Sequence, residues 1–288
     1  MEAHIKTGLV VEGGGMKCAY SAGILDRFLD EDIHFDYVIG VSAGASNSAS
    51  YLAKQRGRNL RFYTDHVTDK RYFGFYSFLK TGDLFGLDHI YSTLTNSDGA
   101  DPIDLAEIQR DPAEYEIVVT NAVTGRPEFI SKESIHQDEY EVFKATSCIP
   151  AVCRARHMDG NDYFDGGLSD PIPVDRAVKV GCKKMVVILS KPRDYVKEPQ
   201  KMMAFVKLRC RKYPRIIKIV ENRHKMYMKR FRKIFELEEQ GRAFVFAPSE
   251  HMDSGTFKMD PDGNYKLYLL GISDFDVRRE ELRKFLES

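Results

Sequence analysis

Three short segments of this sequence carry residue types that together could perform nucleophilic chemistry. Ser42 lies at the centre of Gly40-Val41-Ser42-Ala43-Gly44, the triplet Gly13-Gly14-Gly15 precedes it, and Asp165-Gly166-Gly167 follows it. A serine hydroxyl becomes a nucleophile when a base removes its proton, and a carboxylate can be that base. Backbone N–H groups of a glycine-rich turn can stabilise the charge that develops on an attacked carbonyl oxygen.

The Gly-x-Ser-x-Gly pattern around Ser42 is typical of a tight turn from a strand into a helix, which exposes the hydroxyl. The apolar residues Tyr37-Val38-Ile39 predict a buried strand before the turn, and a helix is expected from Ser46 to Lys54. The N-terminus of that helix would favour an oxyanion. A turn with a purely structural purpose is the alternative.

A Ser-His-Asp triad is not favoured by the positions of the histidines. Only two predicted strands precede Ser42, and the histidines after Asp165 are His224, in a basic helical stretch, and His251, in a polar loop. Neither stands in a motif, so both are expected to be surface residues.

The glycine triplet follows a predicted strand and opens a predicted helix, which suits an anion. Two anions remain open, a bound phosphate and a transient oxyanion. A dinucleotide-binding turn would have a third spaced glycine where Cys18 stands, and the Gly-Lys-Ser/Thr of a phosphate-binding loop is missing. The pairing with Ser42 favours an oxyanion hole built from the N–H groups of Gly13, Gly14 and Gly15. Lys17 either adds positive potential there or is an ordinary exposed lysine.

Asp165 is followed by two glycines, which predicts a tight turn with the carboxylate at its tip. Placed near Ser42, this carboxylate would act as the general base of a Ser-Asp dyad. In the alternative reading, the side chain only caps its own turn. Asp170 is a rival base, but Pro171 follows it, and a structural role is expected.

Taken together and in this order, these motifs resemble those of the patatin-like phospholipases. The matching segments are Glu12-Gly13-Gly14-Gly15-Met16-Lys17, Gly40-Val41-Ser42-Ala43-Gly44 and Asp165-Gly166-Gly167, and Ala145-Thr146-Ser147-Cys148-Ile149-Pro150 resembles the stretch leading to the aspartate turn. The resemblance covers about residues 7–175. Residues 64–72 and the basic C-terminal region further resemble the bacterial subgroup that has a C-terminal extension.

The resemblance implies a three-layer α/β/α fold and hydrolysis of acyl esters of lipids without a metal or organic cofactor. Ser42 would be the nucleophile, Asp165 the base, and Gly13, Gly14 and Gly15 the oxyanion hole. Cys18 departs from the family loop, which usually ends in glycine. If that position needs a positive φ or a close backbone approach, cysteine would strain the loop.

Alternating apolar strands and amphipathic helices predict an α/β fold with a central, mainly parallel sheet over about residues 1–195. The expected strands are 8–11, 37–39, 116–120 and 184–190, and the expected helices are 16–29, 46–54 and 175–180. Residues 1–195 are therefore predicted to be the catalytic domain. Residues 196–288 are predicted to be a basic, mainly helical extension. Apolar residues at helical spacing within 205–208 and 226–237 predict helices there, followed by a strand at 244–246 and a terminal helix at 275–286.

The extension concentrates positive charge, although the whole chain of 288 residues has a net charge of zero. Residues 201–233 contain thirteen Lys or Arg and one acid, Glu221, a local net charge of +12. This region could dock peripherally on an anionic membrane. Its helix faces could equally be solvated and paired with the acidic remainder. The overall neutrality gives no support for nucleic-acid binding.

Composition indicates a cytoplasmic protein, since no signal peptide or membrane-spanning run is found. The cysteines Cys18, Cys148, Cys153, Cys182 and Cys210 are scattered, and we expect them to be reduced and buried. The aromatic segment 72–79 could line an acyl-chain pocket, act as a lid or pack in the core. Two other functions stay open, a catalytically silent scaffold that binds partners and a phosphate- or nucleotide-binding protein.

Overall fold

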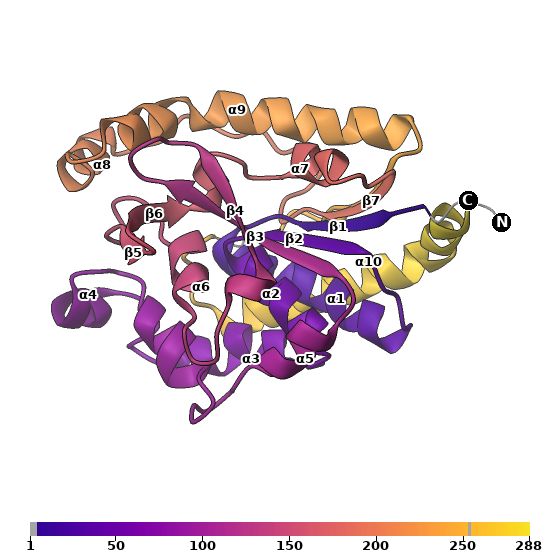
Figure 1. Ribbon diagram of the computed structural model, residues 1–288, viewed down its shortest axis with the longest axis horizontal. Coiled ribbons are helices and arrows are strands. Elements are labelled where there is room, and N and C mark those ends of the chain that lie inside the picture. Colours follow the sequence, from indigo (N-terminus) through magenta and orange to yellow (C-terminus); the bar gives the residue numbers. More distant parts are fainter. Residues whose placement is uncertain (1–4, 253–254) are drawn as a thin grey trace.

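The computed structural model describes residues 5–252 and 255–288 and has three layers (Figure 1). The middle layer is an eight-stranded sheet of order β5-β6-β3-β2-β1-β7-β8, in which β4 also pairs with β3. The strands are β1 (Thr7–Val11), β2 (Tyr37–Val41), β3 (Glu114–Asn121), β4 (Pro127–Ser131), β5 (Arg156–Met158), β6 (Asn161–Asp165), β7 (Lys184–Ile188) and β8 (Ala243–Phe246).

Helices cover both faces of this sheet. The α-helices are α1 (Ala19–Asp30), α2 (Ala43–Leu52), α3 (Arg58–Thr64), α4 (Phe75–Thr81), α5 (Leu105–Arg110), α6 (Glu141–Thr146), α7 (Val174–Lys179), α8 (Met203–Arg209), α9 (Pro214–Glu239) and α10 (Pro261–Glu287). Short 3₁₀ turns are η1 (Gly15–Cys18), η2 (His66–Thr68), η4 (Lys132–Ser134) and η5 (Gly166–Leu168), and η3 (His89–Leu94) is a π-helical turn. None of the helices in the described part of the chain is long and apolar enough to cross a membrane.

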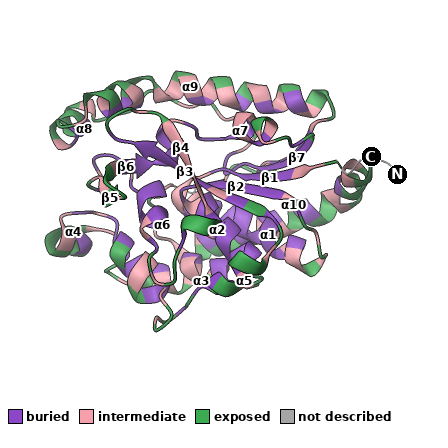
Figure 2. Cartoon of the chain, viewed as in Figure 1, coloured by how far each residue is buried: buried purple, intermediate pink, exposed green. Residues whose placement is uncertain are grey.

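The strands have apolar residues on both faces, and each face has its own core. In β1, Leu9 and Val11 belong to the core beneath α1, α2 and α10, whereas Val10 belongs to the core beneath α7 and α9. Side chains alternate between the two faces of a strand, so a run of buried apolar residues requires a cover on each side. The buried residues concentrate in the sheet and on the inner helix faces (Figure 2).

The central strands β8, β7, β1, β2 and β3 pair in parallel, as the sequence predicted, whereas β4, β5 and β6 are antiparallel. The sheet is therefore mixed. The three antiparallel strands were not expected, because two of them have neither a long apolar run nor deep burial: β4 is half-buried along its length and β5 has only three residues.

Residues after 195 take part in the same three layers. β8 pairs in parallel with β7 at the edge of the central sheet, α9 packs on one face, and α10 packs against α1 on the other (Figure 1). The strand expected at 244–246 and the helices expected within 201–237 are present. The terminal helix is longer than expected, because it begins at Pro261 with Asp260 as its cap.

The basic stretch 201–233 is partly neutralised by ion pairs with its own Glu221 and with acids of the rest of the chain. Ion pairs join Arg209 to Asp83 (3.6 Å), Arg230 to Asp170 (3.3 Å), Lys207 to Glu221 (3.0 Å) and Lys233 to Asp175. Other cations remain exposed on α9 and in the turn between α8 and α9: Arg211, Lys212, Lys218, Lys225, Lys229 and Arg232.

Candidate active site

Ser42 lies on a strained turn between the buried strand β2 and helix α2. Its backbone has φ 54° and ψ −130°, a conformation that costs a non-glycine residue about 1–3 kcal/mol. The flanking glycines make the turn possible. A Cβ on Gly40 would lie 2.4 Å from the Cα of Ala45, and one on Gly44 would lie 2.5 Å from the Glu12 carbonyl oxygen.

Thr146, at the end of α6, holds the turn from the other side. The backbone N–H of Ser42 donates to Thr146 Oγ1 (2.9 Å), and the Thr146 hydroxyl donates to the carbonyl oxygen of Val118 (2.6 Å). Both Thr146 and the Val118 carbonyl are buried, so this link ties Ser42 to β3. The sequence analysis named Thr146 only as part of the segment 145–150 that resembles the family. It did not predict that the Thr146 hydroxyl holds the Ser42 turn, because nothing in that segment points to Ser42.

Asp165 reaches Ser42 because two strands end against the same edge of β3. β2 pairs with β3 as far as Val41, opposite Val118, and β6 takes up the next position, with Asp165 opposite Val119. The turn after β2 and the turn after β6 therefore meet. The approach is close, since a Cβ on Gly166 would lie 2.1 Å from the Val118 carbonyl oxygen.

The Asp165 carboxylate is buried, 4% exposed, and accepts a hydrogen bond from the Gly167 N–H (2.7 Å). It therefore caps its own turn and also faces Ser42. Burial raises the pKa of Asp165 above its ordinary value, while the charge of Arg223 and the nearby Ser42 hydroxyl lower it in part. A carboxylate with a raised pKa is a better proton acceptor than an exposed aspartate.

The glycine loop packs directly against Ser42. A Cβ on Gly13 would lie 2.9 Å from the Ser42 Cβ and 2.7 Å from the Val41 carbonyl oxygen, so only glycine fits there. Within the described residues, the backbone N–H groups of Gly13, Gly14 and Gly15 donate no hydrogen bond. Unpaired N–H groups beside a nucleophile are what an oxyanion hole requires.

Cys18 does not strain the loop. Its φ is −73°, in the ordinary right-handed helical region, and its fully buried thiol donates to the Glu12 carbonyl oxygen at 3.4 Å. The loop residue with a positive φ is Gly15, at 58°. Like Cys18, the other four cysteines are free and buried, as expected.

Glu12 anchors the loop to α9, and this role was missed by sequence reasoning. Its buried carboxylate accepts hydrogen bonds from the Ser190 N–H (2.8 Å), Lys191 Nζ (2.5 Å) and the Tyr227 hydroxyl (2.8 Å). These partners come from the chain just after β7 and from helix α9. A glutamate followed by three glycines gives no sign of partners about two hundred residues away.

Ser42 lies where two cavities meet. One is mostly apolar, encloses about 70 Å³ and is lined by residues that include Met16, Phe62, Tyr63, Tyr72, Leu87 and Tyr91. The other is larger, about 430 Å³, and is lined by Ser42, Asp165, the glycine loop and several cations. The narrow apolar cavity suits an acyl chain, whereas the wider cavity suits a polar group.

The other residues that the sequence analysis weighed for the site lie outside both cavities. His251 is exposed and contacts Asp194 (2.9 Å), and neither it nor His224 lines a cavity with Ser42. Asp170 faces Arg230 at 3.3 Å, and its burial raises its pKa to about 6. Lys17 lies over the Tyr195 ring, 6.0 Å from its centroid.

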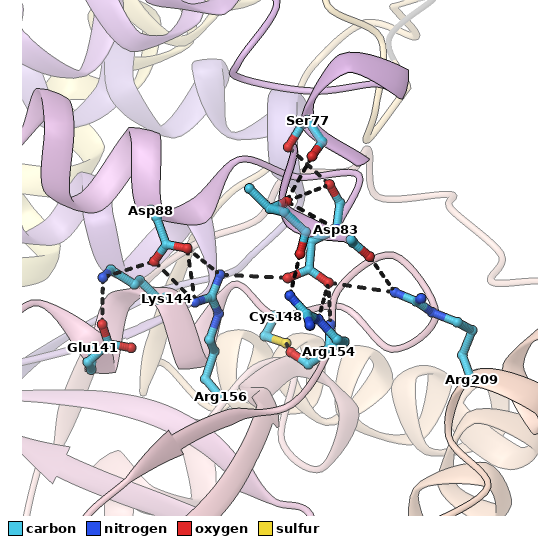
Figure 3. A network of polar contacts seen from close by, with 11 residues as sticks. Ser77, Asp83, Asp88, Glu141, Lys144, Cys148, Arg154, Arg156 and Arg209 are labelled. Carbon is cyan, nitrogen blue, oxygen red and sulfur yellow. Dashed lines mark hydrogen bonds and ion pairs between the residues drawn. The ribbon is translucent and has the colours of Figure 1, made fainter. Parts of the chain in front are cut away.

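The aromatic residues of segment 72–79 have different surroundings, and some line a cavity whereas others are exposed. Tyr72 lines the apolar cavity, Phe73 lines the wider one, and α4 exposes Phe75, Tyr76 and Phe78. The base of α4 is fixed by the polar network around the buried Asp83 (Figure 3). In that network the Arg154 N–H donates to the Asp83 carboxylate (2.8 Å), Ser77 donates to the Asp83 carbonyl (3.0 Å), and Arg209 of α8 lies 3.6 Å away.

Comparison with known families agrees with this geometry. The family model described as patatin-like phospholipase matches residues 9–178, more than half of the chain. The chain belongs to the patatin-like phospholipase family. A second model, described as a domain of unknown function (DUF6363), matches residues 213–287 and so covers α9, β8 and α10.

A curated relative of this patatin-like chain is the uncharacterised protein YjjU of Escherichia coli K12. The two are 28% identical over 197 residues, which is 68% of this chain and 55% of YjjU, so the match spans about half the length of that relative. Among solved structures, VipD from Legionella pneumophila is similar with a TM-score of 0.47 and 14% identity, over 99% of this chain and 67% of VipD.

Proposed function

We propose that this patatin-like protein is a serine acyl hydrolase that cleaves acyl esters of lipids with a Ser42–Asp165 dyad. Membership of the family supports lipid hydrolysis in general. The observation that carries the proposal is the meeting of three features at one cavity: the strained Ser42 turn, the buried Asp165 carboxylate, and the glycine N–H groups, which donate no hydrogen bond among the described residues.

In the proposed reaction, Asp165 accepts the proton of Ser42 while Oγ attacks the ester carbonyl carbon. The N–H groups of Gly13, Gly14 and Gly15 bind the resulting oxyanion. The C–O bond to the alcohol then breaks, and the alcohol leaves with the proton from Asp165. A water molecule gives a proton to Asp165 as it attacks the acyl-enzyme. When the bond between the acyl carbon and Ser42 Oγ breaks, Asp165 returns this proton to Oγ, and the fatty acid is released.

A fluorophosphonate probe tests the dyad, because it labels only an activated serine. We expect labelling at Ser42, located by mass spectrometry, none in Ser42→Ala, and a rate about 100-fold or more lower in Asp165→Asn, the range typical for loss of a general base. Asp170→Asn is the matched control, since Asp170 lies outside both cavities, and it should label like the wild type.

Folding of each variant is checked by its thermal melt. A folded wild-type chain that does not label, or a Ser42→Ala variant that still hydrolyses esters, contradicts the proposal. The first result favours the silent-scaffold alternative.

We further propose that the protein contacts anionic membrane surfaces through α4, α8 and the neighbouring basic residues. Leu79 of α4 is 68% exposed and Leu208 of α8 is 65% exposed. Arg209 connects the two helices, since it donates to the Gly82 carbonyl oxygen (2.9 Å) and lies 5.9 Å from the Phe78 ring centroid. Exposed apolar side chains among cations are suited to an anionic lipid surface.

A further inference from the structure

One wall of the wider cavity is strongly cationic and comes from residues beyond the patatin-like match. Lys191, Lys197, Lys201 and Arg223, which we call the cationic wall, line the cavity that also contains Ser42 and Asp165. Arg223 belongs to α9, and the three lysines lie in the connection between β7 and α8. None of the four lies within residues 9–178, which the family model matches.

The charge of this wall is only partly compensated. Lys191 pairs with Glu12 at 2.5 Å, and Lys201 lies 3.7 Å from Glu198. Arg223 donates through Nε to a neutral group, the Gly167 carbonyl oxygen, at 2.9 Å. Among the described residues, no carboxylate forms an ion pair with Lys197 or Arg223.

The side chain of Lys197 lies close to the other positive charges of the wall. Its Nζ lies 5.3 Å from the centroid of the Tyr227 ring, and Lys191 Nζ lies 5.1 Å from the same centroid. Burial, together with the charges of Arg223 and Lys191, lowers the pKa of Lys197 to about 8. Like charges held together in a half-buried cavity repel one another, and an anion bound among them would relieve that repulsion.

Ser42 lies between the apolar cavity and the cationic wall, so an ester bound at Ser42 would have its two ends on different sides. The apolar cavity leads away from Ser42 on the side of α2 and α3, and the cationic wall lies on the side of α9. A lipid ester with its carbonyl at Ser42 and its acyl chain in the apolar cavity would direct its alcohol part towards the cationic wall. Lysine and arginine are the usual ligands of phosphate groups.

We propose that the cationic wall binds the phosphate of the substrate's head group, which makes the substrate an anionic phospholipid or lysophospholipid. The inference rests on the hydrolase function proposed above and assigns a role to the C-terminal part of the chain. Lys197 is the central ligand of this site, because among the described residues its Nζ forms no ion pair and no hydrogen bond and contacts only the Tyr227 ring.

The test compares two substrates that differ only in the phosphate: oleoyl lysophosphatidic acid and monooleoylglycerol, each in neutral mixed micelles. We expect the full-length wild type to prefer the phosphorylated substrate in kcat/KM. In Lys197→Gln the preference should fall about tenfold, the worth of one charge-assisted hydrogen bond. Lys225→Gln, an exposed lysine of α9 that lines neither cavity, is the matched control and should keep the preference.

A binding measurement separates this inference from the hydrolase proposal. Calorimetry on Ser42→Ala, with hexanoyl lysophosphatidic acid and monohexanoylglycerol, reports head-group recognition without turnover. Tighter binding of the phosphorylated ligand that is lost in Ser42→Ala/Lys197→Gln supports the cationic wall even if the wild type hydrolyses nothing. Equal binding of the two ligands overturns the inference, even if the wild type cleaves neutral esters.

Inorganic phosphate is the alternative ligand that the cationic wall could bind. Inorganic phosphate should inhibit hydrolysis of the phosphorylated substrate only weakly, because it lacks the acyl chain that fills the apolar cavity. Inorganic phosphate that binds as tightly as hexanoyl lysophosphatidic acid would show a site for the free ion, and the head-group assignment would then be wrong.

Discussion

Ser42 combines a strained backbone with a side chain that is almost buried, 8% exposed. Strain of this kind persists only where the surroundings fix it, and here they are close-packed glycines on both sides and the Thr146 link to β3. The same packing holds the hydroxyl at the junction of the two cavities. A single residue thus defines where an ester carbonyl has to lie.

The protonation of Asp165 predicts how activity depends on pH. As the base, it must be ionised, so activity should be low when it is protonated and should rise with pH through its pKa. Because burial raises that pKa, the acid limb of kcat/KM for a neutral, water-soluble ester should lie above the usual range of an aspartate, about 4.

Arg223 provides the check on this assignment, since its charge lowers the pKa of Asp165, as Lys191 does more weakly. In Arg223→Gln the acid limb should move to higher pH, and in the control Lys225→Gln it should not move. An acid limb that stays unchanged in Arg223→Gln would exclude Asp165 as the group that titrates.

At the scale of elements, α1 and α10 cross in unusually close contact. A Cβ on Gly23 of α1 would lie 2.2 Å from the Tyr268 carbonyl oxygen, and one on Gly271 of α10 would lie 2.2 Å from that of Tyr20. Glycine usually weakens a helix. Here the two glycines allow the backbones to touch, and so they dock the C-terminal helix on the first one.

Gly271→Ala should therefore destabilise the fold. The gain in helix propensity is at most about 1 kcal/mol, while overpacking against a backbone atom costs about 1–3 kcal/mol. Thermal unfolding should show a lower Tm for Gly271→Ala, and Ser273→Ala, an exposed position on the same helix, should be unchanged or slightly stabilised. A Tm of Gly271→Ala at or above that of the wild type would show that the helices separate easily.

At the scale of the whole molecule, the C-terminal part completes both the fold and the cavity. β8 extends the sheet, α9 and α10 cover opposite faces, and Tyr227 and Arg223 reach the glycine loop and the Asp165 turn. The exposed apolar residues of α4 and α8 lie on the same side of the molecule as the mouth of the wider cavity, which Met202 and Phe205 line.

This arrangement predicts binding to vesicles that contain phosphatidylglycerol, measured by flotation at low salt and weakened at high salt. Leu79→Asp on α4 should reduce binding about tenfold or more, because it removes apolar burial worth about 1.5 kcal/mol and adds a repelled charge. Val277→Asp on α10 makes the same charge change at an 81% exposed apolar position and should bind like the wild type. Equal loss in both variants, or no flotation at low salt, contradicts the contact.

Local patterns in the sequence determined much of this protein. Apolar runs located the central strands, small residues located the turns at Gly13, Ser42 and Asp165, and helical spacing located α1, α8 and α9. Each of these features depends on neighbours within a few residues, because side-chain period and turn geometry are local properties. The assignment of catalytic roles to Ser42 and Asp165 stays a prediction.

Only the tertiary structure decided which distant residues meet. The residues around Glu12 do not predict its contact with Tyr227, and those around Asp165 do not predict that Arg223 lies nearby. Both contacts form because α9 packs across the sheet. The ordinary φ of Cys18 and the cationic wall likewise depend on how segments pack together. Chain-distant contacts are set by complementary surfaces, and a single sequence carries no local signal for them.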